Sequence, residues 1–391
     1  MADTARFNQF KILMRKIGYS VGLENSFGRL RDLAALYQEE HQISLGSWQK
    51  LVTDVWGLKS FHIGDFFNAL GVLHVAKGKI DVLPGLDALA VSSVGLDEAE
   101  SRRAQAAIFL GLLIEHDGEI FLNCLVAGFD ADEVERKLTS LIHYKRRLLF
   151  GMFKTPGVQL ELARIVGIER QLKNSGSSSP AKSLSDQRRR EPLEARTGDL
   201  SNPGIPPVSI SPDYLRKVPG RRRDWAVSAG LWVSDQGITE SGSRLLDELQ
   251  GLRLRLEDGA VVLWPFEHEI LRLRLSPTTF DDKVIGYWDF VALAIVGSGG
   301  TVRRNVEPGD DAAVAAVLAD QILAYRSLNR PKAMLRREYP LTVAFPAISS
   351  NFLARGLPVP PLPDLIGPGK PLDSQFQYRT SRNSVGALSM R

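Results

Sequence analysis

A spacing of two glycines recurs three times along this 391-residue chain and constrains its fold more than any other feature. In each case an apolar run ends at a glycine, and a second glycine stands seven residues later, close to an isoleucine. The three pairs are Gly71 with Gly78, Gly111 with Gly118, and Gly230 with Gly237. A glycine after the last helical residue can close a helix in the left-handed conformation, and the second glycine suits a tight turn. The pattern predicts three units, each with a helix, a short strand and a turn.

The sequence after the third pair predicts a helix and then a β-hairpin. Thr239 can cap a helix that ends at Gly251. Residues 252–256 alternate strictly between apolar and basic, a turn dipeptide Asp-Gly occupies 258–259, and residues 260–264 supply a returning apolar strand. After the second pair, residues 130–133 form a possible capping box for a further helix.

The third segment resembles the winged helix, a helix-turn-helix variant that carries a β-hairpin. The resemblance rests on a helix that ends in Gly230-Leu231, a glycine turn, and Ile238-Thr239-Glu-Ser-Gly242-Ser-Arg-Leu245-Leu246. It extends over residues 51–89, 102–154 and 213–275, and only the last block has the Thr-x-x-Gly element. Members of this family bind duplex DNA through a helix in the major groove and a basic wing, and other members serve as protein-interaction modules.

The predicted fold class is mainly α with short β-hairpins (α+β), in which tandem winged-helix-like units are joined by a flexible basic linker. The predicted divisions are an N-terminal helical segment at 1–50, two winged-helix-like units at 51–170, a disordered basic linker at 171–212, a winged-helix domain at 213–275, a C-terminal α/β portion at 276–354 and a proline-rich tail at 355–391. The tail composition predicts an extended arm or a solvated tail outside the core.

The net charge of +4 is local in origin. Between residues 171 and 223 the chain has eleven Lys and Arg residues against five acidic residues, together with Ser-rich and Pro-rich runs. A flexible segment of this composition either binds along a polyanion, with release of counterions, or is simply a solvated linker.

Arginines and lysines at helix ends and along the hairpin are the candidate DNA contacts, because phosphate contacts supply position and affinity. They are Arg188, Arg189, Arg190, Arg221, Arg222, Arg223, Lys145, Arg146, Arg147, Arg253, Arg255, Arg303 and Arg304. Structural alternatives remain for several. The cations at 145–147 suit a helix carboxyl end, and those at 253 and 255 suit the solvated side of a strand.

No catalytic constellation is evident in the sequence. Histidine and cysteine spacings suit no zinc site, and Asp281-Asp282-Lys283, expected in a loop, is the best metal-nuclease candidate. We therefore expect no cofactor and no metal, and an enzyme is the less favoured class. The single cysteine, Cys124, lies in an apolar string that predicts a buried structural thiol. The chain lacks the apolar run of about 18 residues that a bilayer span needs, which predicts a cytoplasmic protein.

Together these features predict a non-catalytic DNA-binding component of a larger bacterial assembly for antiviral defence, restriction or chromosome processing. Duplex DNA and protein subunits, such as an ATPase or a nuclease, are the expected partners, and no membrane is involved. The alternatives are a protein-protein adaptor whose winged helices no longer contact DNA, and a metal-dependent nuclease.

Overall fold

The structure of the protein, a computed structural model, describes most of the chain outside one long central stretch. The described residues are 25–58, 63–76, 79–141, 212–256, 258–263, 280–328, 339–381 and 384–390.

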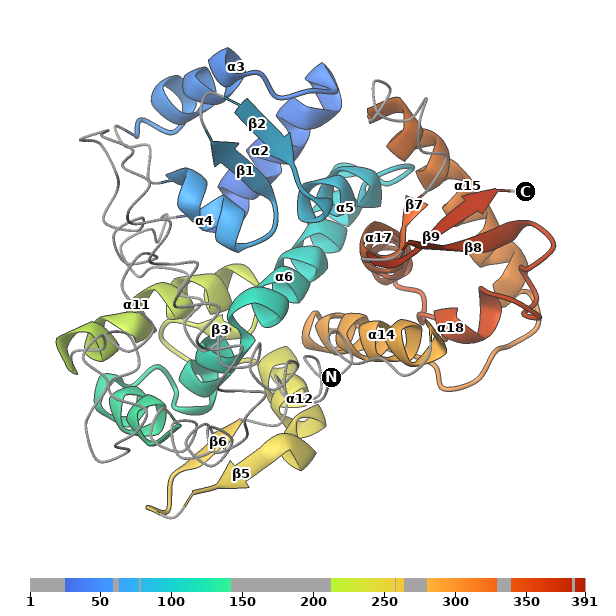
Figure 1. Ribbon diagram of the computed structural model, residues 1–391. Coiled ribbons are helices and arrows are strands. Elements are labelled where there is room, and N and C mark those ends of the chain that lie inside the picture. Colours follow the sequence, from blue (N-terminus) through green and yellow to red (C-terminus); the bar gives the residue numbers. More distant parts are fainter. Residues whose placement is uncertain are drawn as a thin grey trace, which may run out of the picture.

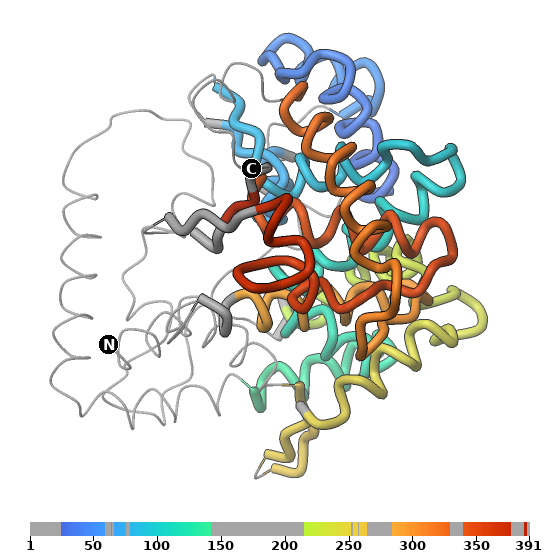
Figure 2. The backbone as a smooth tube through the Cα atoms, turned by 90° about the vertical axis from the view of Figure 1, so that its right-hand side faces the viewer, coloured from blue at the N-terminus to red at the C-terminus, as the bar shows by residue number. Residues whose placement is uncertain are grey.

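The described body is mainly helical, with short antiparallel sheets (Figures 1 and 2). This agrees with the predicted class of mainly α with short hairpins. The helices are α2 (Ser26–Glu40), α3 (Leu45–Lys50), η2 (Leu51–Val55), α4 (Ile63–Ala69), α5 (Pro84–Ser92), α6 (Glu98–Val126), α11 (Pro212–Ser228), α12 (Glu240–Glu248), η3 (Gln250–Leu252), α14 (Phe280–Gly297), α15 (Asp310–Leu328), α17 (Leu341–Ala354) and α18 (Leu362–Leu365). Residues 131–141 are also helical.

Within the described ranges, the strands form three two-stranded sheets and one three-stranded sheet, ordered β1-β2, β3-β4, β5-β6 and β7-β9-β8. Their bounds are β1 (Leu73–Ala76), β2 (Lys79–Val82), β3 (Trp232–Val233), β4 (Gly237–Ile238), β5 (Arg253–Arg255), β6 (Val261–Leu263), β7 (Tyr339–Pro340), β8 (Phe376–Ser381) and β9 (Ser384–Met390). All the sheet pairings are antiparallel.

Helix α6 lies at the centre of the described body (Figure 1). Its start is fixed by a capping box in which Asp97 accepts a hydrogen bond from the Glu100 amide at 2.8 Å and Glu100 accepts one from the Asp97 amide at 3.1 Å. Helices α5, α14 and α17 pack together with α6, and α11 and β6 also contact it. Aromatic and aliphatic side chains along its length, such as Phe109 and Phe121, are completely buried. Burial of this kind drives folding because it removes apolar surface from water.

The glycine pattern predicts local structure correctly in the third segment and incorrectly in the second. Gly230 ends the turn after α11 with a φ of 74°, and Gly237 opens β4 with a φ of 88°. Gly71 likewise has a φ of 72°, just before β1. Gly111, by contrast, lies inside the continuous helix α6, so the predicted turn and strand there are wrong. Seven residues are about two helical turns, so glycines at this spacing share one helix face as readily as they flank a turn.

A matched pair of glycine substitutions tests this difference. Gly230→Ala is expected to lower the free energy of unfolding by about 1–2 kcal/mol, because an L-residue is strained at a left-handed φ. The added β-carbon would meet no atom within 4 Å, so this cost comes from the backbone conformation alone. Gly111→Ala is expected to raise it by about 0.5–1 kcal/mol, because alanine suits a helix interior better. Its β-carbon would lie 3.5 Å from that of Ala294, an ordinary contact. Urea denaturation measures both, and an equal loss in the two variants would contradict a continuous α6.

The predicted helix and hairpin after the third glycine pair are also present. Thr239 caps α12 by accepting a hydrogen bond from the Gly242 amide at 3.1 Å. The hairpin β5–β6 turns at Gly259, whose φ is 82°. The packing differs from that of a separate unit, however, because α11 packs on α6 and α2 whereas α12 packs on α14. The third segment is therefore built into a shared core.

The C-terminal region is part of the core, which corrects the prediction of an arm or a solvated tail. Strand β9 pairs with both β7 and β8, and Val302 forms a parallel bridge with Val359. The apolar side chains between the prolines and just after them are buried: Val359, Leu362, Leu365, Ile366, Leu372 and Phe376. The prolines themselves suit this path, because they stand in irregular segments, in the first turn of α18 and in the turns that follow it.

Among the described helices, none combines the length and the apolar character that crossing a bilayer requires.

Candidate nucleic-acid interface

The hairpin β5–β6 presents two arginines to solvent. Arg253 and Arg255 are exposed, whereas Leu254 between them is half-buried and packs against a small apolar cluster. The cluster comprises Leu141, Leu256, Ala260 and Val262. This alternation follows from the two-residue repeat of a strand, which places successive side chains on opposite faces. The hairpin projects from the edge of the body in both views (Figures 1 and 2).

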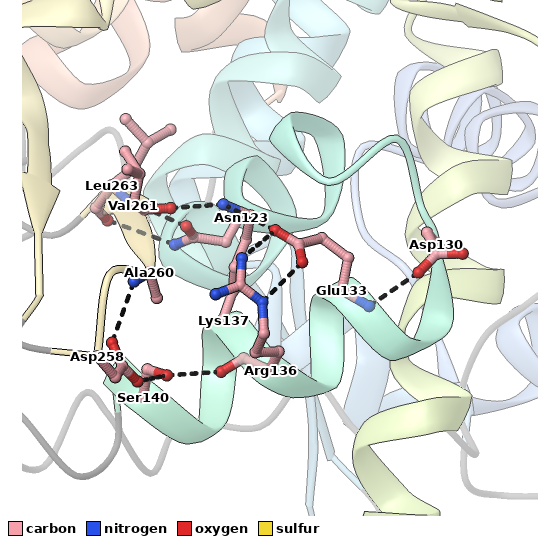
Figure 3. A network of polar contacts seen from close by, with 10 residues as sticks. All are labelled: Asn123, Asp130, Glu133, Arg136, Lys137, Ser140, Asp258, Ala260, Val261 and Leu263. Atoms are coloured by element: carbon pink, nitrogen blue, oxygen red, sulfur yellow. Dashed lines mark hydrogen bonds and ion pairs between the residues drawn. The ribbon is translucent and has the colours of Figure 1, made fainter.

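Side chains of α6 and of the helix at 131–141 hold the other strand of the hairpin in place (Figure 3). Asn123, which is completely buried, accepts a hydrogen bond from the Leu263 amide at 3.0 Å and donates one to the Leu263 carbonyl at 3.5 Å. The same amide group donates to the Glu119 carbonyl at 2.7 Å. Asn123 therefore supplies β6 with the two hydrogen bonds that a neighbouring strand would otherwise provide. Lys137 adds a third contact, because its ammonium donates to the Val261 carbonyl at 2.6 Å.

The carboxylate of Asp258 stabilises the turn of the hairpin through two hydrogen bonds. Asp258 accepts a hydrogen bond from the Ala260 amide at 3.1 Å and a second one from the Ser140 hydroxyl. The bond from Ser140, followed by that from Ala260, lowers the pKa of Asp258 from its ordinary value of 3.8. Glu133 lies on the helix at 131–141, which also carries Ser140. The hydrogen bond that Arg136 donates to Glu133 is the main cause that lowers the pKa of Glu133 from 4.5. Glu133 also lies 3.3 Å from the Lys137 ammonium.

These two lowered pKa values predict that the attachment of the hairpin weakens in acid. A group whose folded-state pKa lies below its unfolded value contributes stability above the unfolded pKa and loses it as the pH falls through the folded pKa. The contributions of Asp258 and Glu133 are therefore expected to be complete above about pH 5 and to be lost progressively as the pH falls from their ordinary pKa values through the lowered folded-state values. Comparing the melting temperature of the protein with that of Asp258→Asn between pH 3 and pH 6 measures the effect, and a parallel acid decline in both would count against it.

The arginines at 221–223 on α11 have separate roles. Arg223 is exposed, and Arg221 lies 3.6 Å from Asp224 on the same helix. Arg222 is completely buried, with two hydrogen bonds of 2.8 and 2.9 Å from its guanidinium to the carboxylate of Asp117. Its guanidinium also lies 5.1 Å from the ring centre of Trp225. Arg222 thus ties α11 to α6, which corrects its assignment to a phosphate-contacting surface.

Cys124 lies near this ion pair and is fully buried, as the apolar sequence around it predicts. Burial raises its pKa to about 12, against a smaller opposing effect of Arg222. The thiol is therefore protonated at neutral pH, which suits a packing role.

Arg303 also forms ion pairs within the protein. It lies 2.5 Å from Glu307 and 2.6 Å from Asp310, and its side chain is 19% exposed. These contacts brace the turn before α15, so Arg303 is not a free surface cation. Arg304 beside it is exposed.

The remaining predicted contacts, Lys145, Arg146, Arg147, Arg188, Arg189 and Arg190, lie outside the described residues, as does the predicted linker except for Pro212, with which α11 begins. Asp281, Asp282 and Lys283 belong to the first turn of α14, whereas the sequence placed them in a loop. Within the described ranges, no three His, Cys, Asp or Glu side chains gather in a group that could hold a metal ion.

Comparisons of the chain with protein-family models, with curated proteins and with solved structures give no match. The chemistry of the site therefore rests on its own geometry. The structure brings together the two hairpin arginines and the buried contacts that fix the hairpin. The sequence analysis identified the arginines and did not single out Asn123 or Lys137.

Proposed function

We propose that the protein binds duplex DNA through the arginine side of β5, as a non-catalytic component of a larger assembly. One observation carries the proposal: Arg253 and Arg255 are exposed on a projecting hairpin whose partner strand is fixed by Asn123 and Lys137. Residues two apart on a strand are separated by about 6.6 Å. The charges of one DNA strand recur about every 3.4 Å of helix axis, and because the strand winds around that axis, neighbouring phosphates lie farther apart than this rise. Two guanidinium groups at this spacing can each meet a phosphate.

The proposal draws on the winged-helix resemblance of the third segment, and above all on its hairpin. The order of helix, glycine turn, capped helix and hairpin is the one on which the resemblance rests. Exposed Arg223 on α11 and exposed Arg304 are further cations that a nucleic acid could approach. A bacterial assembly for defence, restriction or chromosome processing and a place in the cytoplasm belong to the same proposal.

Salt-dependent binding to a fluorescent DNA duplex tests the proposal with the full chain. Arg253→Ala/Arg255→Ala is expected to lower the affinity about tenfold or more near 0.1 M salt, and to reduce the slope of log K against log salt by about 2. The matched control is Arg102→Ala/Arg103→Ala, which removes the same charge from exposed positions near the start of α6. This control lies about 30 Å of helix away from Asn123 and is expected to change the affinity little.

Equal losses in the two double variants would mean that binding follows net charge alone and would contradict a hairpin contact. Absence of any duplex binding by the full chain at low salt would favour the adaptor. That alternative has its own supporting observation, because Val227, Val233 and Ile238 near the end of α11 and in the β3–β4 pair are large exposed apolar residues.

A further inference from the structure

The hairpin β5–β6 has one closed edge and one open edge. On the closed edge, the main-chain groups of Leu263 and Val261 that point away from β5 are hydrogen-bonded to Asn123 and Lys137. Strand β5 lies farther from α6 than β6 does (Figure 1), and among the described strands only β6 pairs with it. A strand edge without a partner presents unpaired N–H and C=O groups, to which another extended chain can add.

The pairing register shows which main-chain groups point to the open edge. The Leu256 amide donates to the Ala260 carbonyl at 2.8 Å, so these two residues form a hydrogen-bonded pair. Because hydrogen-bonded and non-hydrogen-bonded pairs alternate along an antiparallel ladder, the main-chain groups of Arg255 and Arg253 point away from β6. The Arg253 amide is already bonded to the Gln250 carbonyl. The N–H and C=O of Arg255 and the C=O of Arg253 are therefore available to an added strand.

The side chains along β5 define what such a strand must carry. Arg253 and Arg255 are exposed, and within the described part of the chain neither forms an ion pair. Leu254 between them is half-buried and packs on the apolar cluster that includes Val262. Residues that stand opposite each other in an antiparallel pair share a face of the sheet, and opposite charges there are stabilising. Acidic, apolar and acidic residues in succession therefore complement β5.

We propose that β5 binds an extended segment of a partner protein with the pattern acidic-apolar-acidic, which adds to the open edge as an antiparallel strand. Its first acidic residue stands opposite Arg255 and its second opposite Arg253. Its main chain accepts a hydrogen bond from the Arg255 amide and donates one to each of the Arg255 and Arg253 carbonyls. Its apolar residue lies beside Leu254. This inference does not rest on DNA binding, because the main-chain hydrogen bonds are open to a peptide strand whatever the arginine side chains bind.

Isothermal titration calorimetry of the full chain with the peptide acetyl-Thr-Glu-Val-Glu-Thr-amide tests strand addition. N-methylation of both glutamates removes the two N–H donors that face β5 and keeps both charges, and it is expected to weaken binding about tenfold or more. The matched control peptide carries its two methyl groups on the valine and on the threonine after the second glutamate. Their N–H groups point away from β5, so this peptide is expected to bind within about twofold of the unmodified one.

Two protein variants test the charge part of the site. Arg253→Ala/Arg255→Ala is expected to weaken binding of the unmodified peptide about fivefold to tenfold, because the ion pairs are lost while the main-chain groups stay. Arg102→Ala/Arg103→Ala removes the same charge from exposed positions of α6 and is expected to leave peptide binding unchanged. At saturation with the unmodified peptide, the Arg255 amide is expected to exchange with solvent about tenfold more slowly than in the free protein.

Equal affinities of the three peptides would show attraction by charge alone and would overturn strand addition, as would no binding of the unmodified peptide at millimolar concentration. A protein that binds DNA and not the peptide would overturn this inference and leave the proposed function standing. A protein that binds the peptide as expected and not DNA would support this inference and contradict the proposed function.

Discussion

Replacing Arg222 with methionine is expected to lower the free energy of unfolding by about 3–5 kcal/mol, because removal of one partner leaves a buried charge without compensation. Arg222 and Asp117 are both completely shielded from solvent, and two hydrogen bonds of 2.8 and 2.9 Å join them. The pair connects α11 to α6 across 105 positions of sequence. Its loss therefore also loosens the packing of Trp225, whose indole lies beside the guanidinium and donates to Ser26 at 3.2 Å.

The neighbouring position provides the control. Arg223→Met makes the same substitution at an exposed residue of the same helix and is expected to change stability by less than about 0.5 kcal/mol. The double variant Arg222→Met/Asp117→Leu is expected to recover most of the loss, because replacing a buried ion pair by apolar residues is often close to neutral. Urea denaturation of the four proteins measures all the differences. Similar effects of Arg222→Met and Arg223→Met would show that Arg222 is not a buried partner of Asp117.

The buried role of Arg222 could be predicted from the sequence by helical periodicity. Leu215, Val218, Trp225 and Ala226 are buried on one face of α11, and position 222 falls on the same stripe at spacings of three and four residues. The sequence analysis instead treated three adjacent arginines as one surface cluster. Adjacent residues on a helix point in different directions, so a cluster in sequence is not a cluster in space.

Local chemistry explains what the sequence predicted well. The turn at Gly230, the cap at Thr239 and the Asp-Gly hairpin turn each depend on a few neighbouring residues, and all are present. Exposure of Arg253 and Arg255 follows from strand alternation. Such features are fixed within a few residues and need no knowledge of the rest of the chain.

Long-range packing explains what the sequence did not predict. Two glycines seven residues apart fit a helix as well as a turn. At Gly111 the chain is helical, because this part of α6 packs against α14. The C-terminal prolines suggested a tail by composition, whereas β9 finds a partner strand at Tyr339, about fifty positions away. The pocket lined by α5, α6, α14 and α17 could not be predicted from the sequence either, because its walls come from elements spread between residues 71 and 350.

Replacing Asn123 with leucine is expected to cost about 2–4 kcal/mol, because the buried N–H and C=O of Leu263 each lose a hydrogen-bond partner and such orphaned groups cost about 1–3 kcal/mol apiece. The substitution conserves size, so the loss comes from hydrogen bonding. Asn305→Leu, at an exposed position in the turn before α15, is the matched control and is expected to be nearly neutral. Urea denaturation compares the two, and faster amide exchange at Val261 and Leu263 would place the effect at β6.

The same variant separates the position of the hairpin from its charge. Asn123→Leu leaves every arginine and lysine in place, so the general attraction of the protein for a polyanion is unchanged. If the fixed hairpin is what places Arg253 and Arg255 against phosphates, DNA affinity is expected to fall severalfold under conditions where the variant remains folded. The number of contacts, measured by the salt slope, is expected to decrease along with it. Unchanged affinity together with faster exchange in β6 would show that the rigid attachment of the hairpin contributes nothing to DNA binding.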